Sequence, residues 1–260
     1  MVHPFFARAR ATGRPLILGH RGAMAHATEN TMTAFALARE HGADGIEFDV
    51  QLSADGHVVI FHDAFLARLA GRGEMPTALD LATLQAVRIG RDERIPTLAQ
   101  VLDEFADSEM VLNIEVKPPG LGRGGPLVDQ VLAQVARYRT QESGRRSDSL
   151  LERVLISSFD PFVIGRVRRR APEFATAYLF HEEEPAILIK AWRAPAFRPH
   201  ALHPEYPMLT APRLGRWRKW AFELATWTID DDAHLRRAAA MDVYAVISND
   251  PRHARQVLLD

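Results

Sequence analysis

The sequence predicts an α/β fold, a (β/α)8 TIM barrel formed by a single domain over residues 1–260. Short apolar or β-branched runs recur along the whole chain, and most are separated by stretches with helical character. Strands that alternate with helices form a parallel sheet. A chain of about 250 residues closes such a sheet most economically as a barrel of eight strands. No shift in composition and no repeat of fixed period divides the chain.

Nine runs are candidates for the eight barrel strands, in the order Leu16–His20, Gly45–Val50, Val58–His62, Met110–Lys117, Val154–Phe159, Ala175–Phe180, Pro199–His203, Leu224–Ile229 and Val243–Ser248. Helices are expected over Asn30–His41, Leu98–Ala106, Pro126–Tyr138, Phe162–Arg170, Ala211–Ala221, Asp231–Ala240 and Pro251–Leu258. The run Pro199–His203 is short and lies between prolines, which donate no hydrogen bond to a sheet. We therefore expect it to be the candidate that is not a barrel strand. The polar stretch Gln141–Asp148 is expected to form a loop.

Composition excludes several classes of protein. The chain is 47% hydrophobic and 25% charged, as globular proteins are, and its formal net charge of −1 gives no overall field that would attract nucleic acid or an anionic membrane. It has no cysteine, which excludes disulfides, thiolate zinc sites and cysteine nucleophiles. No apolar window approaches the roughly 20 residues that span a bilayer, and the N-terminal apolar run is too short for a signal peptide. We expect a cytoplasmic protein without integral membrane association.

Two carboxylates lie on one face of the second strand candidate. Strand parity places Glu47 and Asp49 on the face opposite Ile46, Phe48 and Val50. A parallel barrel strand is covered on both sides, so two inward carboxylates require a cation to neutralise them. A half-exposed antiparallel strand with a polar face explains this segment alone about as well.

A second strand candidate favours the cation. The same parity separates Asn113, Glu115 and Lys117 from Ile114 and Val116, so a third carboxylate points inward. Three carboxylate ligands in a chain without thiols indicate one hard divalent cation, Mg2+ or Ca2+. The alternative is that Glu115 and Lys117 form a surface ion pair.

Two histidines end strand candidates, His20 and His62. Strand C-termini form the catalytic face of a TIM barrel, and imidazole transfers protons near neutral pH. Arg21 follows His20 and offers a forked donor suited to phosphate. The set of side chains suits an anionic substrate, and a phosphate ester fits best.

One geometric difficulty concerns His62. Too few residues separate Val50 from His57 for a helical crossover, which takes about a dozen residues. A plain hairpin directly after Asp49 would send His62 to the opposite end of the barrel. We therefore expect the chain to descend in an extended segment over 50–54, turn at Asp55-Gly56, and climb back to the catalytic end.

The motifs of the chain resemble those of the glycerophosphodiester phosphodiesterase family, in particular its compact bacterial cytoplasmic type. The resemblance is carried by His20-Arg21-Gly22, Glu29-Asn30-Thr31, Ala34-Phe35, Gly42-Ala43-Asp44, Ile46 to Val50, Asp55-Gly56, Val59 to Asp63, Ile95 to Leu98, Asn113 to Lys117, Ser157 to Phe159, Trp227-Thr228 and Ile247-Ser248. These motifs cover almost the whole chain, and their spacing between residues 20 and 63 is more specific than any one of them.

The resemblance implies a metal-dependent barrel that hydrolyses glycerophosphodiesters to glycerol 3-phosphate and an alcohol, through a cyclic phosphate intermediate in one version of the mechanism. By motif, Glu47, Asp49 and Glu115 match the metal ligands, and His20 and His62 match the acid/base pair. Arg21 and Lys117 match the phosphate contacts. Phe159 and Trp227 match the lining of the substrate pocket.

His203 is a further candidate for contact with the substrate, because it lies near the end of the run 199–203. The alternative is that His203 is an ordinary loop histidine without contact to the substrate.

The chain departs from the family pattern at three positions. Thr28 stands where the family usually has proline, Asp230 where it usually has asparagine after the tryptophan motif, and Asn249 where the last strand often ends in aspartate. None of the three removes a proposed ligand or proton carrier. We expect them to affect loop shape and the detail of the pocket.

Two other functions stay open at this point. A lysophospholipase D-like phosphodiesterase would share the site and accept a lipid chain, and an exposed apolar rim near Phe65, Leu66 and Leu69 would favour it. A barrel that only binds glycerophosphates is the second alternative. The expected partner is a small-molecule glycerophosphodiester. The sequence does not identify its alcohol, the native metal, which histidine is the base, or the oligomeric state.

Overall fold

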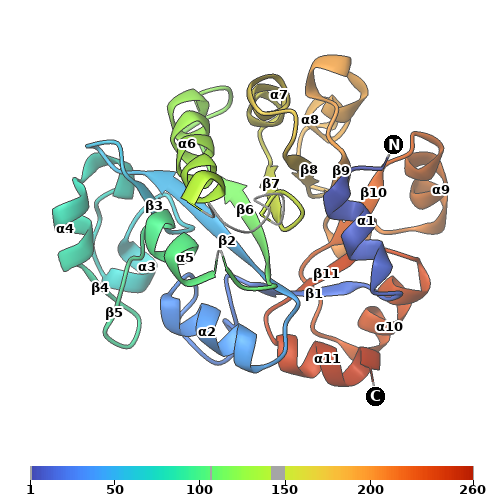
Figure 1. Ribbon diagram of the computed structural model, residues 1–260, viewed down its shortest axis with the longest axis horizontal. Helices are drawn as coiled ribbons and strands as arrows, with labels where there is room; N and C mark the ends of the chain where they lie inside the picture. Colours follow the sequence, from blue (N-terminus) through green and yellow to red (C-terminus); the bar gives the residue numbers. More distant parts are fainter. Residues whose placement is uncertain (1, 106, 142–149, 260) are drawn as a thin grey trace.

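The computed structural model describes residues 2–105, 107–141 and 150–259. Eight parallel strands close into a barrel, each hydrogen-bonded to the next in the order β1, β2, β6, β7, β8, β9, β10, β11 and back to β1. The predicted (β/α)8 barrel is thus confirmed (Figure 1). The predicted loop 141–148 lies, apart from residue 141, outside the described residues. The barrel strands are β1 (Leu16–His20), β2 (Gly45–Leu52), β6 (Val111–Val116), β7 (Val154–Ser158), β8 (Ala175–Phe180), β9 (Ala201–Pro204), β10 (Glu223–Thr226) and β11 (Ala245–Ser248).

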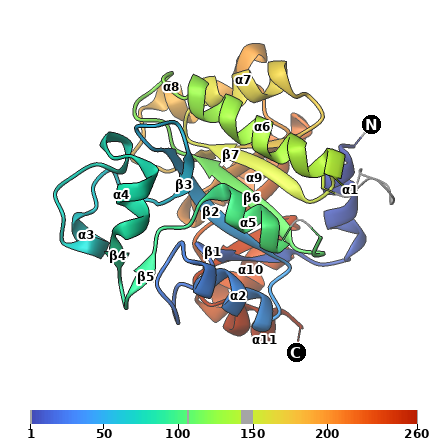
Figure 2. The same ribbon diagram turned by 60° about the vertical axis from the view of Figure 1, so that its left-hand side comes forward.

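Helices surround the barrel and follow its strands in sequence (Figures 1 and 2). In α5 the buried residues recur with helical spacing at Leu98, Val101, Leu102 and Phe105, which gives one apolar face against the sheet. The crossover helices are α2 (Met32–Glu40), α5 (Leu98–Phe105), α6 (Gly125–Gln141), α7 (Pro161–Arg170), α8 (Ala186–Ile189), α9 (Ala211–Lys219) and α10 (Asp232–Ala240), and α11 (Pro251–Leu259) follows the last strand. In the described part of the chain, no helix combines the length and apolar character needed to cross a bilayer.

Strand β2 shows how parity sorts side chains between the two faces of the barrel wall. Ile46, Phe48 and Val50 face outward into the apolar layer beneath the helices. Glu47 and Asp49 alternate with them, are buried, and face the barrel interior. The strands therefore deliver polar groups to the barrel axis without interrupting the outer core.

Helix α1 (Pro4–Ala11) packs against the inward-facing side chains of the barrel. Phe5 and Phe6 are each only 1% exposed, and they pack in one cluster with alanines of β8, β9, β10 and β11. Small inward side chains leave room for two phenyl rings, so the helix completes the core at the end away from the strand C-termini. The Phe6 ring lies 5.0 Å from that of Tyr244 in an edge-on contact.

The expectation for the run 199–203 is wrong. Residues 201–204 form the barrel strand β9, which pairs in parallel with both β8 and β10. The prolines do not interrupt it, because Pro199 precedes the strand and Pro204 ends it, where a missing N–H costs little. The candidate that lies outside the barrel is instead β3 (Val58–Ile60), which pairs antiparallel with the far end of β2.

The predicted descent after Val50 is also wrong. Strand β2 runs straight on to Leu52, past the last residue that pairs with β6, and β3 returns beside it with Val50 opposite Ile60. The turn is closed by Ser53, whose hydroxyl accepts from the His57 N–H at 2.9 Å, and Gly56 takes the positive φ of +85°. Because the returning strand is so short, the chain arrives next to Asp49, and His62 stays at the catalytic end.

A small lobe fills the connection between β3 and α5, on the same side of the molecule in both views (Figures 1 and 2). It comprises α3 (Ala67–Ala70), α4 (Leu81–Ala86), and the antiparallel pair β4 (Arg88–Ile89) and β5 (Glu93–Arg94). Short 3-10 turns cover Pro76–Ala78, Ala191–Arg193, Pro195–Phe197 and Tyr206–Met208. Thr28, one of the departures from the family pattern, packs on this lobe, because a side chain at Gly90 would meet its hydroxyl oxygen at 2.2 Å.

Candidate active site

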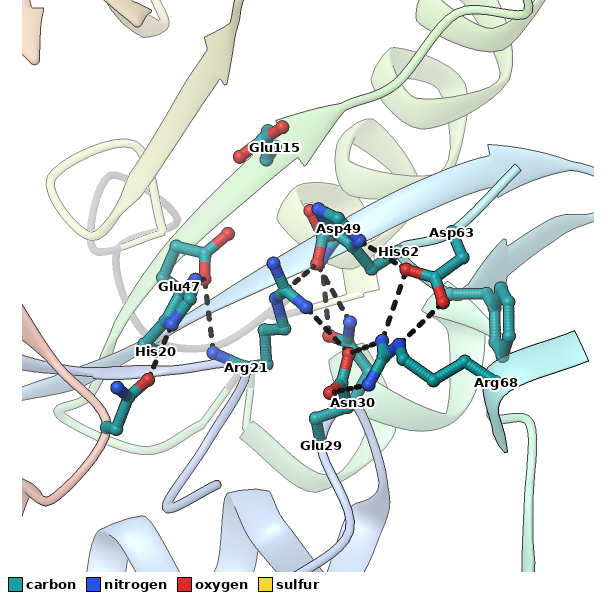
Figure 3. A network of polar contacts seen from close by, with 12 residues as sticks. His20, Arg21, Glu29, Asn30, Glu47, Asp49, His62, Asp63, Arg68 and Glu115 are labelled. Atoms are coloured by element: carbon teal, nitrogen blue, oxygen red, sulfur yellow. Dashed lines mark hydrogen bonds and ion pairs between the residues drawn. The ribbon is translucent and has the colours of Figure 1, made fainter. Parts of the chain in front are cut away.

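Three carboxylates converge at the C-terminal end of β2 and β6 (Figure 3). Asp49 and Glu115 are direct neighbours in the parallel pairing of the two strands, and Glu47 lies one inward position earlier on β2. One oxygen of each of the three lies within 4.8 Å of the others. All three side chains are buried. The sequence prediction that these residues share one site matches the geometry.

The electrostatics of this carboxylate triad suit a divalent cation. Burial, together with the charges of Asp49 and Glu115, raises the pKa of Glu47 well above its usual range. Burial and the charge of Asp49 likewise raise the pKa of Glu115. One Glu47 oxygen, Oε1, is buried and accepts no hydrogen bond. Three buried acids with an orphaned oxygen form a set of hard ligands that Mg2+ or Ca2+ would neutralise.

Asp49 is the exception within the triad. Burial opposes its ionisation, but the charges of Lys117, His62 and Arg21 and a hydrogen bond from Asn30 outweigh burial and lower the pKa of Asp49 to about 2. The Asn30 side-chain amide donates to Asp49 Oδ2 at 2.8 Å. The strand therefore presents at least one carboxylate that is ionised at neutral pH.

His20 ends β1 beside the triad, and its ring is held in one orientation. The Nδ1 atom donates to the Asn249 side-chain carbonyl at 2.7 Å, because the Asn249 amide nitrogen is itself committed to Asp230 at 2.6 Å. Nε2 is therefore left as the acceptor atom, 3.9 Å from Glu47 Oε2. Burial, followed by the neighbouring Arg21 charge, lowers the pKa of His20. The imidazole is neutral at neutral pH and is suited to accept a proton.

His62 faces the same cavity from the segment that follows β3, and it too is held through Nδ1. Its partner is Asp63 Oδ1 at 2.7 Å, and Arg68 donates to the other Asp63 oxygen at 2.8 Å. The side-chain amide of Gln51 donates to the carbonyl oxygens of residues 61, 62 and 63 and so fixes the backbone that carries the imidazole. A carboxylate at Nδ1 can offset the positive charge of a protonated ring.

Arg21 and Lys117 supply positive charge next to the triad. Lys117 Nζ lies 2.8 Å from Glu115 and 3.4 Å from Asp49, and these carboxylates outweigh burial and raise its pKa. Arg21 is held by Glu29 at 2.7 Å, and its Nε lies 3.3 Å from Asp49. Both cations line the cavity at the mouth of the barrel, which has a volume of about 310 Å³.

Phe159 and Trp227 also line this cavity, with their rings 5.5 Å apart and nearly perpendicular. His203 does not. Its ring is fully buried, bonds Tyr244 Oη through Nε2 at 2.6 Å, and lies outside the cavity lining. The expected substrate contact of His203 is therefore corrected, since only its backbone carbonyl serves the pocket, by accepting from Trp227 Nε1 at 2.9 Å.

Sequence reasoning missed several residues of the site. Asn30 was expected only within the first helix, yet Thr31 caps that helix and Asn30 takes a positive φ of +56° and binds Asp49. Gln51 continues the inward parity of Glu47 and Asp49, a signal that could have identified it. The cavity also includes His181 and Glu184 from the loop after β8, for which the sequence carried no signal.

The fold and the site together define a class of protein. Two histidines of fixed orientation, a cluster of acids that could bind a cation, and two fixed positive side chains meet at the C-terminal mouth of a TIM barrel. This arrangement suits a hydrolase that acts on a phosphate ester.

Comparisons with known proteins identify the family. The model of the glycerophosphoryl diester phosphodiesterase family matches residues 20–253. A glycerophosphodiester phosphodiesterase of Caldanaerobacter subterraneus subsp. tengcongensis is 31% identical over 246 residues, which cover 92% of this chain and 95% of the relative. The chain belongs to this family and is a phosphoric diester hydrolase.

Solved structures agree with this assignment. A phosphodiesterase of Oleispira antarctica, in complex with the product sn-glycerol-3-phosphate, has a TM-score of 0.79 at 25% identity, over 95% of this chain and 98% of that one. A glycerophosphodiester phosphodiesterase of Thermotoga maritima has a TM-score of 0.69 at 28% identity, over 92% and 96%.

Proposed function

We propose that this protein hydrolyses glycerophosphodiesters to glycerol 3-phosphate and an alcohol, with a divalent cation held by Glu47, Asp49 and Glu115. The observation that carries the proposal is the placement of this buried triad beside two histidines whose Nδ1 atoms are both engaged, while neither Nε2 atom makes a hydrogen bond to the residues that the structure describes. The relative from Oleispira antarctica, which binds the product glycerol 3-phosphate, supports the choice of substrate.

The positive groups of the site would bind the phosphate. A bound Mg2+ or Ca2+ would act as a Lewis acid on a phosphoryl oxygen. Arg21 and Lys117 would contact the remaining phosphoryl oxygens, and both are already fixed by carboxylates before the substrate arrives. Such preorganised charge stabilises the transition state without reorganisation.

The two histidines would divide the proton transfers between them. A second cavity, of about 380 Å³, shares His62 with the first but does not include His20. We assign the leaving alcohol to this second cavity, so that His62 protonates it, while His20 takes the proton of the attacking hydroxyl. If the glycerol 2-hydroxyl attacks, its P–O bond forms as the bond to the alcohol breaks, which gives a cyclic phosphate. Water then opens the ring, with the two roles reversed.

A coupled assay for glycerol 3-phosphate tests the proposal. The wild-type protein should release it from glycerophosphocholine, lose activity in EDTA and regain it with Mg2+ or Ca2+. His20→Ala and His62→Ala should each lower turnover by about 10² to 10⁴. His234→Ala is the matched control, because that histidine is exposed on α10 and lies outside the cavity lining. Near-normal turnover in either active-site variant contradicts the proton-transfer roles, and indifference to EDTA contradicts the cation.

The residues expected to form an apolar rim give little support to the lysophospholipase D-like alternative. Of the three residues that would form an apolar rim, Phe65 is 52% exposed, Leu66 is fully buried, and Leu69 packs against a core cluster of the small lobe. A single exposed phenyl ring is common on protein surfaces. We therefore favour small diesters, and lysophosphatidylcholine in the same assay distinguishes the two activities.

A further inference from the structure

The two cavities of the site share one wall, and this wall bears on the choice of substrate. Its residues are His62, Glu115, Lys117, Phe159 and Glu184. A phosphodiester has two arms that leave phosphorus in different directions. With the phosphate at the shared wall, the arm next to the triad is the glycerol, and the other arm enters the second cavity. Because Glu184 lines both cavities, an alcohol in the second cavity would lie close to its side chain.

Glu184 is unusual among the acids of the site. It lies in the loop after β8, and its side chain is only 12% exposed. Its Oε2 atom is buried and accepts no hydrogen bond, and the nearest basic nitrogen found for Oε1 is His181 Nε2, at 3.8 Å. Burial raises the pKa of this carboxyl. A buried carboxylate oxygen without a hydrogen bond destabilises the folded protein, and a ligand that supplies a positive charge would offset this loss.

The other acids that line the two cavities are already engaged. Glu47 and Glu115 belong to the triad. Asp160, in the second cavity, accepts from the N–H of Phe162 at 2.8 Å through one oxygen and from the N–H of Gly122 at 2.6 Å through the other. Among the acids that line these cavities in the described part of the chain, Glu184 is therefore the one outside the triad with an unused oxygen.

We propose that Glu184 is a specificity-determining residue, which binds the positively charged nitrogen of an amino alcohol as the leaving group of the diester. The inference rests on the proposed function and adds the class of alcohol. The cationic surroundings of the phosphate site favour this assignment: Arg21 and Lys117 would repel an ammonium group, and Glu184 offsets them on the alcohol side. Phe159, in the same wall, offers an aromatic surface to a methylated nitrogen.

The experiment compares diesters that share glycerol 3-phosphate and differ in the alcohol. Substrates are glycerophosphoethanolamine and glycerophosphocholine, which carry a positive nitrogen, and glycerophosphoglycerol, which does not. Glu184→Gln keeps the shape and removes the charge. The matched control is Glu183→Gln, an exposed neighbour in the same loop. Glu184→Ala is the second variant, and circular dichroism confirms that each variant is folded.

The wild type should prefer the two charged substrates. Glu184→Gln should lower kcat/KM about tenfold for both, mainly through KM, and leave glycerophosphoglycerol within about twofold. Equal losses on all three substrates would place Glu184 at the shared glycerol arm and overturn the inference, as would no loss on any of them. A wild type that hydrolyses none of the three refutes the proposed function, and the inference falls with it. A wild type that hydrolyses all three substrates at similar rates refutes only the role of Glu184 and leaves the proposed function standing.

Discussion

His20 Nδ1 and the side-chain oxygen of Asn249 lie 2.7 Å apart, and Asp230 holds Asn249 through both its amide nitrogen and its backbone N–H. Asp230 and Asn249 are the two positions where the sequence exchanges the asparagine and aspartate of the family pattern. The structure shows that the exchanged residues touch each other. His20 therefore bonds the neutral amide of Asn249, and the Asp230 carboxylate contacts that amide instead of the imidazole.

This exchange predicts a shift in pH dependence. A carboxylate at position 249 would favour the protonated His20 and so raise a pKa that burial now lowers. If His20 is the base, as proposed, it must be neutral to accept a proton, so the acidic limb of kcat/KM should move to higher pH by about one unit or more in Asp230→Asn/Asn249→Asp. Asp230→Asn alone is the control and should leave the limb in place. An unchanged profile in the double variant would show that His20 is not the base.

Gln51 should matter for turnover through the position of His62. Gln51→Glu has the same shape but cannot donate to the three carbonyl oxygens of residues 61–63. We expect kcat to fall at least tenfold, and the free energy of unfolding by about 1–3 kcal/mol because buried acceptors lose their partner. Steady-state kinetics and urea denaturation measure the two effects. A wild-type kcat in Gln51→Glu would show that the pairing of β2 with β3 positions His62 without the Gln51 amide.

Glu47 should oppose folding when no cation is bound. Glu47→Gln removes a buried carboxyl whose pKa burial and two neighbouring carboxylates raise, so without divalent cation the variant should be more stable at neutral pH than the wild type by about 1–2 kcal/mol, or a rise in Tm of about 2–8 °C. The wild type should gain stability when Mg2+ or Ca2+ is added, and the variant should not. Thermal melts in EDTA and in added cation provide the comparison. A variant that the cation stabilises as much as the wild type would exclude Glu47 as a ligand.

The phenyl ring of Phe6 should stabilise the barrel without affecting chemistry. It is 1% exposed among inward-facing side chains at the end away from the site. Phe6→Ala should cost about 3–5 kcal/mol, while KM stays unchanged at low temperature. Val2→Ala, at a position 64% exposed, is the control and should cost almost nothing. A large change in KM would mean that α1 communicates with the site.

Strand parity was the part of the sequence that predicted the site best. It placed Glu47, Asp49 and Glu115 on inward faces, because a period of two is a local property of an extended chain. The barrel followed from the alternation of strands and helices. His20 and His62 were both placed at the catalytic end, although the path to His62 was wrong.

Most of the failures share a physical cause, since they depend on contacts between segments that the local pattern of residues does not reveal. Whether β2 turns back or continues past the rim depends on pairing with β3, and whether 201–204 forms a strand depends on β8 and β10. His203 was assigned by its position in a run, yet it is the partner of Tyr244, which lies 41 residues away. Glu184 belongs to a loop with no regular pattern.

Strand β2 and the returning strand β3 form one continuous stretch of chain that carries residues with different proposed roles. In the proposed function, two cation ligands, the general acid and the amide that fixes it all lie between residues 47 and 62. A one-residue slip in this stretch would turn every one of these side chains to the wrong face at once. A graft of 45–63 into another eight-stranded barrel would therefore transfer Glu47, Asp49, Gln51 and His62 together, and the new barrel would have to supply counterparts of His20, Arg21, Glu115 and Lys117.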